Sequence, residues 1–223
     1  MTRFRTKRLV ASALLAVLAF TLSGCWNPFA PDEGDPQPVP PADYHDRLTP
    51  QDVLHNLQTA YVWKNAVQYL DCLSEGFAFY PSDADVQDPN QNIPPVWWKP
   101  DERTMHENMF ASSSDVESIS LTLTITSIIF YENDPDIDSD NEYDVLVDVD
   151  LRVNVVGDLT YLATAPSQYI MRIDIDQPGP DNEDTWWEIV EWYDLGDPGR
   201  GDSEDEPGVV RVSFAELKQL FME

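Results

Sequence analysis

An acidic segment in the second half of the chain has the residue types that bind a hard cation. Asp136, Asp138 and Asp140 alternate within the run DPDIDSDNEYD, and alternate carboxylates on a loop suit Ca²⁺. They fit the first three ligand positions of an EF-hand, but the twelfth position is Val147, where that loop uses a bidentate glutamate. The three aspartates are therefore no more than candidate Ca²⁺ ligands. The alternative is an acidic hairpin loop that keeps a Trp-rich chain soluble.

Acid–base chemistry would need a carboxylate or histidine that points into an apolar pocket, with a hydrogen-bonding neighbour. The strand carboxylates fall on the opposite parity from the apolar residues, which places them outside: Asp148, Asp150, Asp174 and Asp176. Among the three histidines, His106 is expected on a polar helix face, and His45 and His55 show no catalytic spacing. No catalytic pair and no cofactor are predicted.

Two sets of residues leave an enzyme open as the alternative. Four tyrosines could border a pocket, although an aromatic core is the commoner reason for them: Tyr61, Tyr69, Tyr161 and Tyr169. Three polar side chains would turn inward if a helix boundary moved by one residue: His55, Asp71 and Glu75.

The N-terminus has the parts of an export signal. The cationic run MTRFRTKR precedes the 14-residue apolar run LVASALLAVLAFTL and the residues SGC, the order found in secretory signals. The apolar run is shorter than the roughly 20 residues that span a bilayer. Residues 1–24 are therefore predicted to be a signal peptide.

The four residues before and including Cys25, LSGC, resemble a bacterial lipobox. The resemblance implies that Cys25 becomes the first mature residue and carries acyl chains that anchor the protein in a membrane, each buried methylene adding about 0.8 kcal/mol. Trp26, rather than an aspartate, follows the cysteine, which favours the periplasmic face of the outer membrane if the organism has one. Cys72 then has no intramolecular disulfide partner and is predicted to be a buried hydrophobe.

The charge excludes one class of partner. The chain has 41 acidic residues against 13 Lys and Arg, for a formal net charge of −28. Four of those cations lie in the first eight residues. An acidic surface of this kind repels phosphate backbones, so no nucleic-acid partner is expected.

Residues 25–48 are predicted to be an acylated tether. Six prolines fall in the run from 26 to 48, and they favour a semi-rigid spacer of polyproline character. A proline-rich ligand for a recognition module is the alternative, and only composition supports it.

Residues 49–223 are predicted to form one domain in which helices come before strands. Thr49 and Pro50 open a helix, a second runs from about residue 66 to 73, and Gly76 turns the chain into a short strand at 77–80. A loop at 81–100 precedes a third helix through about Phe110. Long alternating strands follow, with a bulge near 127–129 and a bend or an edge at Pro166. A capping box at Ser213 opens a terminal helix.

This order of elements resembles the nuclear-transport-factor-2-like, or SnoaL-like, cone fold. The run LSEGFAFY, the strand residues around Trp187 and Trp192, and the ending SFAELKQLF carry the resemblance. It implies an α+β fold with N-terminal helices packed in the concave face of a strongly curved, mainly antiparallel sheet. Some members of that family are isomerases, dehydratases or cyclases and others bind partners, so the fold does not assign a function.

The function expected is a non-catalytic module at the cell envelope that binds a small apolar ligand or a protein partner. The alternatives are a small-molecule isomerase, dehydratase or cyclase that uses the cone, and a Ca²⁺-stabilised surface protein. The contents of the cone discriminate between binding and catalysis, because only catalysis requires an inward acid or base beside room for a substrate.

Overall fold

The computed structural model describes residues 42–132, 141–178, 185–196 and 207–222. Within them, one seven-stranded sheet has the order β2-β1-β6-β5-β4-β3, with β7 paired to β5. All neighbouring strands are antiparallel except β1–β6 and β5–β7. The strands are β1 (Leu73–Tyr80), β2 (Trp97–Trp98), β3 (Val116–Glu132), β4 (Asn141–Val155), β5 (Leu159–Pro178), β6 (Thr185–Asp194) and β7 (Val209–Arg211).

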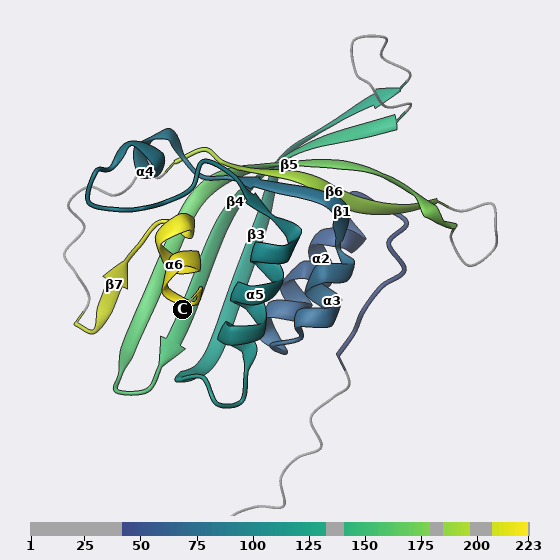
Figure 1. The fold of residues 1–223 in the computed structure, drawn as a ribbon. Coiled ribbons are helices and arrows are strands. Elements are labelled where there is room, and N and C mark those ends of the chain that lie inside the picture. The colour runs from purple at the N-terminus through teal and green to yellow at the C-terminus, as the bar shows by residue number, and fades with distance from the viewer. Residues whose placement is uncertain (1–41, 133–140, 179–184, 197–206, 223) are drawn as a thin grey trace, which may run out of the picture. The chain divides into compact units, whose positions relative to one another are not determined.

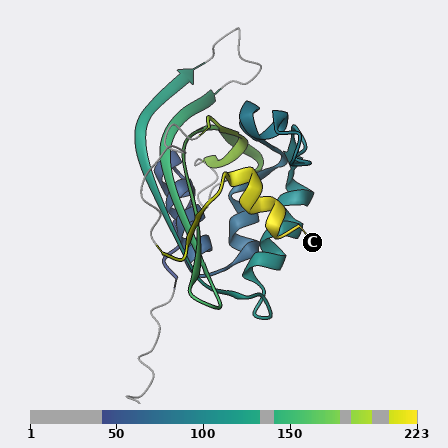
Figure 2. The same cartoon turned by 90° about the vertical axis from the view of Figure 1, so that its left-hand side faces the viewer.

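The longer helices pack inside the curve of this sheet, and the short α4 lies near one end of it, as Figures 1 and 2 show. They are α2 (Pro50–Val62), α3 (Ala66–Asp71), α4 (Asp83–Gln87), α5 (Lys99–Phe110) and α6 (Phe214–Leu220). The α+β class with a curved, mainly antiparallel sheet is therefore as predicted.

Local signals in the sequence set the ends of the helices. The Thr49 hydroxyl accepts a hydrogen bond from the Asp52 amide, and Pro50 takes the first helical position of α2. Lys64 has φ +50°, a left-handed conformation that ends α2 before Asn65 caps α3. Ser213 and Glu216 form the predicted capping box of α6.

The long strands bury alternate residues. Between residues 145 and 153 of β4, the buried side chains are Val145, Val147, Val149, Leu151 and Val153. Between them, Asp148 is exposed and Asp150 accepts a hydrogen bond from Arg152 on the surface. The predicted parity is confirmed for these two aspartates. The side chains of Asp174 and Asp176 lie outside the described residues.

Two irregularities bend the sheet. The β3–β4 register shifts between Ile125 and Ser127, so Thr126 is the extra residue of a bulge just before the predicted position. Pro166 lies where β5 changes neighbours, because β7 pairs with residues 160–162 and β6 pairs from Ser167 onward. A residue without an amide hydrogen is tolerated at such a gap.

Several details differ from the prediction. Gly76 lies within β1, which begins at Leu73, and not at a turn before the strand. The β1–β6 register is interrupted between Leu73 and Ala78, and this irregularity accommodates Gly76. The predicted loop at 81–100 contains α4 and β2, and β7 was not predicted. These short elements depend on tertiary pairing and lack a periodic sequence pattern.

Residues 42–48, assigned to the tether, pack onto the domain. Arg47 is buried, donates to the Asp71 carbonyl oxygen and lies over the Trp186 ring, 4.9 Å from its centroid. The Arg47 carbonyl oxygen accepts a hydrogen bond from the Trp187 amide at 2.8 Å. This segment therefore belongs to the folded unit, which extends from Ala42 to Glu223.

Several sequence predictions fall outside the described residues. Cys25, with the rest of residues 1–41, is among them, and so are Asp136, Asp138 and Asp140. Cys72 is described, and it is a free, buried cysteine as predicted. Among the described residues, no helix has the length and apolar character to cross a bilayer.

The inward face of β4 gives a direct test of the fold. Val149 is 3% exposed, so we expect Val149→Asp to bury an unpaired charge and to lower the free energy of unfolding by about 3–5 kcal/mol. Val156, in the turn directly after this strand, is 64% exposed, and the same substitution there is the matched control. Urea denaturation of both variants measures the difference. Equal stability of the two would contradict the assigned parity.

Candidate functional site

The interior of the cone contains a carboxylate and an imidazole, both from α5. Glu102 and His106 are completely buried. His106 was predicted on a polar face, and that prediction is wrong. The two residues share the inward stripe of α5 with Met105, Met109 and Phe110 at helical spacing.

The Glu102 carboxylate accepts hydrogen bonds from two side chains, one on each oxygen. Its Oε1 accepts a hydrogen bond from the ammonium of Lys218, on α6, and the two side chains form an ion pair. Its Oε2 accepts the Tyr69 hydroxyl at 2.7 Å. Burial, and then the negative charge of Glu102, raise the pKa of Tyr69 well above its ordinary value, so Tyr69 remains a donor.

His106 is held in one neutral tautomer. Its Nδ1 lies 2.8 Å from the Glu102 carbonyl oxygen, which only accepts, so Nδ1 carries the proton. Its Nε2 therefore accepts the Tyr61 hydroxyl at 2.8 Å. Burial, and then the nearby charge of Lys218, lower the pKa of His106 well below its ordinary value. The imidazole is thus uncharged near neutral pH.

Lys218 is further enclosed by aromatic rings. Its Nζ lies 4.3 Å from the ring centroid of Phe79 and 4.6 Å from that of Trp192, distances at which a cation is attracted to the ring face. Burial lowers the pKa of Lys218, and the charge of Glu102 opposes that shift. The ion pair and the rings together stabilise an ammonium group that has no access to water.

Tyr169 is one of the four tyrosines that the sequence suggested could border a pocket. It is fully buried on β5, and its hydroxyl has no hydrogen-bond partner among the described residues. Burial, and then the charge of Asp194, raise its pKa. Tyr161, by contrast, is only partly buried at the edge of the core.

Among the described residues, the cavity inside the cone is too small for a substrate. The cavity between Tyr61, Leu151, Phe214 and Lys218 measures about 10 Å³, which is the lower limit for a single water. Ligand pockets usually measure about 300–1,000 Å³. The acid–base groups that catalysis would need are present, but they contact one another and not an open pocket.

A much larger hollow lies on the outside of the helices. A groove of about 880 Å³ is formed by the α2–α3 junction, α3, β1, α5 and β6. Asp71 and Glu75, which could have turned into the cone, line this groove instead. Its other lining residues are Trp63, Lys64, Asn65, Ala66, Val67, Leu70, Leu73, Ser74, Gly76, Lys99, Arg103, Glu107, Glu188 and Val190.

Charges of both signs line the groove. Seven of its 16 lining residues are charged, and three of these are Lys64, Lys99 and Arg103. Lys64 donates to the Val116 carbonyl oxygen at 2.9 Å, and Lys99 donates to Glu75 at 2.8 Å. Arg103 and Val67 are exposed, and Val67 is an apolar side chain with 74% of its surface accessible.

His55 lies elsewhere, outside both the cone and the groove. It stacks on His45 with ring centroids 4.1 Å apart. Sequence reasoning missed this pairing because residues 42–48 had been assigned to the tether.

Comparison with known proteins gives only structural likenesses. No protein-family model matches the chain, and no curated protein matches it. A solved structure of a putative aromatic ring hydroxylase from Novosphingobium aromaticivorans is 16% identical over 66% of this chain and 86% of its own, with a TM-score of 0.44.

Two further solved structures have similar scores. An NTF2-like protein of unknown function in nutrient uptake from Rhodospirillum rubrum is 13% identical over 63% of this chain and 92% of its own, with a TM-score of 0.41. A ketosteroid isomerase-like protein from Erwinia carotovora atroseptica is 9% identical over 64% and 89%, with a TM-score of 0.42. At these values their names transfer no chemistry to this chain.

The buried neutral state of His106 predicts a specific pH dependence. The folded pKa of His106 lies below the unfolded value of 6.5, so the unfolded chain binds more protons below that pH. The contribution of His106 to stability is therefore complete above pH 6.5 and is lost as the pH falls. Between pH 6.5 and 5.5 this group alone lowers the free energy of unfolding by about 1 kcal/mol.

Urea denaturation at the two pH values tests this dependence. In His106→Gln the loss between pH 6.5 and 5.5 is expected to be smaller than in the wild type by that amount. His55→Gln, the same change at a half-buried histidine, is measured in parallel for comparison. An unchanged pH dependence in His106→Gln would mean that His106 is not held neutral.

Proposed function

We propose that this protein is an exported lipoprotein, anchored through acyl chains on Cys25, whose domain binds a partner without catalysing a reaction. The observation that carries the proposal is the contrast between the cavity inside the cone and the groove outside the helices. That cavity measures about 10 Å³ and the outer groove about 880 Å³. A third hollow, beside Tyr80 and Tyr193, is smaller at about 470 Å³, so binding is assigned to the groove.

The lining of the groove favours a polar partner over a small apolar ligand. Small-molecule pockets are mostly apolar with a few polar groups, whereas charged residues make up seven of the 16 that line this groove. Exposed Val67 and half-exposed Trp63 add apolar contacts beside those charges. A polypeptide segment that offers both kinds of side chain matches this surface best.

The lipid anchor rests on the N-terminal sequence. A cationic run, an apolar run and LSGC follow one another in the first 25 residues, and an anchor of two or more acyl chains holds a protein stably on a membrane. Prolines then separate Cys25 from the folded unit that begins at Ala42. In this arrangement the domain is presented at the cell envelope.

Photo-crosslinking tests the groove. A photoreactive residue at position 67 is expected to give a discrete adduct in the intact envelope, and the adduct should decrease at least about fivefold when Arg103→Glu is added. The control is the same photoreactive residue at position 156, which is also exposed and does not line the groove. Equal adducts from both positions, or none from position 67, would contradict the proposal.

Acylation is tested separately at Cys25. The wild-type chain is expected to partition into detergent, with a mature N-terminal peptide that begins at Cys25 and has the added mass of its acyl chains. Cys25→Ser should abolish both properties, whereas Cys72→Ser, at a buried thiol, should retain them. Mass spectrometry that finds an unmodified Cys25 in the mature protein would overturn the anchor.

A further inference from the structure

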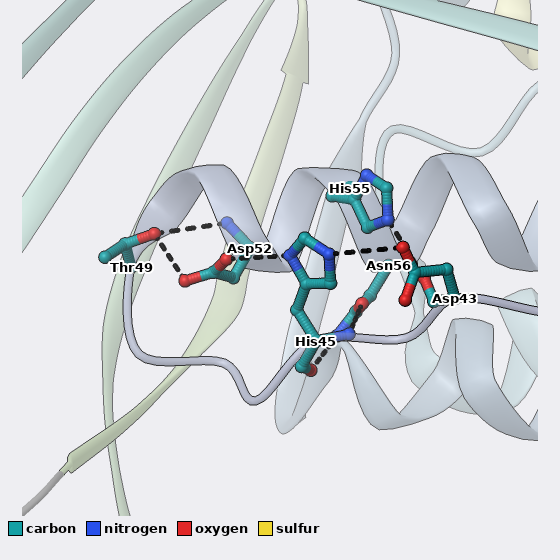
Figure 3. Close-up of polar contacts among 6 residues, drawn as sticks. All are labelled: Asp43, His45, Thr49, Asp52, His55 and Asn56. Atoms are coloured by element: carbon teal, nitrogen blue, oxygen red, sulfur yellow. Dashed lines mark hydrogen bonds and ion pairs between the residues drawn. The ribbon is translucent and has the colours of Figure 1, made fainter.

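Two of the three histidines of the chain meet beside an aspartate at the beginning of the domain. Asp43 and His45 lie on the extended segment before α2, and His55 lies on α2 itself (Figure 3). One potential ligand atom from each residue lies within 4.8 Å of the others. We name these three residues the His–Asp cluster.

The sequence of α2 holds this cluster in place. Asp52, His55 and Asn56 share one face of the helix because they are three and four residues apart. Buried Asn56 fixes the backbone of His45 at two points: its Oδ1 accepts the His45 amide and its Nδ2 donates to the His45 carbonyl oxygen, both at 2.7 Å. His55 then stacks on His45 with 19° between the ring planes.

The orientation of His45 leaves one ring nitrogen for a ligand. Its Nδ1 lies 3.0 Å from Asp52 Oδ1, and the Thr49 hydroxyl holds the same carboxylate at 2.6 Å. A carboxylate partner keeps the proton on Nδ1, so in neutral His45 the lone pair is on Nε2. Carboxylate–histidine pairs of this kind orient the imidazole ligands of metal ions.

The Nε2 lone pair faces a second carboxylate. Asp43 Oδ2 lies 3.7 Å from His45 Nε2, and two acceptors that face each other need a donor or a cation between them, which can be a proton, a water molecule or a metal ion. The Asp43 side chain is 85% exposed, so it can close around an ion without disturbing the core. His55 Nε2 lies 2.9 Å from the Asp43 carbonyl oxygen and donates to it, because a carbonyl oxygen only accepts. The second imidazole is therefore at the same place, and its proton must shift to Nδ1 when Nε2 binds an ion.

From this geometry we propose that the His–Asp cluster is a binding site for a divalent transition-metal ion of the Zn²⁺ type. Two imidazole nitrogens and one carboxylate oxygen suit Zn²⁺, Cu²⁺ or Ni²⁺, whereas Ca²⁺ and Mg²⁺ prefer all-oxygen sites. Three protein ligands leave at least one position for water or another ligand. The ion would link the first residues of the folded unit to α2.

This site is independent of the groove and of the acyl anchor. None of its three residues lines the groove, and the acidic residues Asp136, Asp138 and Asp140 are not part of it. The large negative charge of the chain, −28 at pH 7, attracts any cation weakly. A specific site must therefore be distinguished from that general attraction by single substitutions.

Zn²⁺ titration of the full chain tests the site. The chain carries Cys25→Ser, which removes a competing thiol, has no affinity tag and is treated with a chelator. We expect calorimetry to show one Zn²⁺ per chain that excess Ca²⁺ does not displace. Asp43→Asn and His55→Ala should weaken binding at least about tenfold, and Asp52→Asn should weaken it about 10–100-fold through His45.

The control is Asp46→Asn, the same change at an exposed aspartate of the same segment, and it should leave the affinity unchanged within about twofold. Asp43→Asn alters an exposed side chain, so unchanged thermal unfolding without metal verifies that its fold is intact.

Proton NMR provides an independent measurement. One equivalent of Zn²⁺ should shift the imidazole resonances of two histidines and leave those of buried His106 in place. Zn²⁺ binding that is equally strong in Asp43→Asn and His55→Ala, or a lack of shifts at two histidines, would overturn the site.

Discussion

The closed interior of this fold depends on the buried ion pair between Glu102 and Lys218. A charge at either position is tolerated inside the core only because the opposite charge contacts it, and removal of one partner from such a pair typically costs about 3–5 kcal/mol. The pair joins α5 to α6, which encloses the C-terminal helix against the aromatic residues of β1 and β6. The same two side chains are buried inside the curve of the sheet.

The other polar side chains of the interior form a hydrogen-bond network around this ion pair. Tyr69 donates to Glu102, His106 donates to the Glu102 main chain, and Tyr61 donates to His106. These are the residue types of a general acid–base site, yet each is paired with another protein group and the remaining cavity measures about 10 Å³. The network therefore stabilises and orients the helices. The two sites proposed for binding, the groove and the His–Asp cluster, therefore lie outside this network.

The sequence predicted the long elements well because their patterns are periodic. The alternation on β4 assigned the buried face correctly from Val145 to Val153, and caps located the starts of α2 and α6. Short elements such as β2 and β7 were missed because pairing with distant strands creates them.

The polar interior was missed for a different physical reason. Glu102 and His106 lie at helical spacing from Met105 and Met109, so the stripe itself was visible, but charged and polar residue types were assigned outward by default. Only a buried partner makes Glu102 acceptable inside, and that partner is 116 residues away. The His–Asp cluster escaped notice because the proline-rich composition masked the point at which the folded unit begins.

The central claim is that the cone is closed by its own side chains. A high-resolution crystal structure of the protein purified from its native source tests this most directly. We predict the Lys218 ammonium on the Glu102 carboxylate, with density for at most one water between Tyr61, Leu151 and Phe214. Density for a bound molecule there, or Lys218 turned away from Glu102 with a row of waters in its place, would contradict the account.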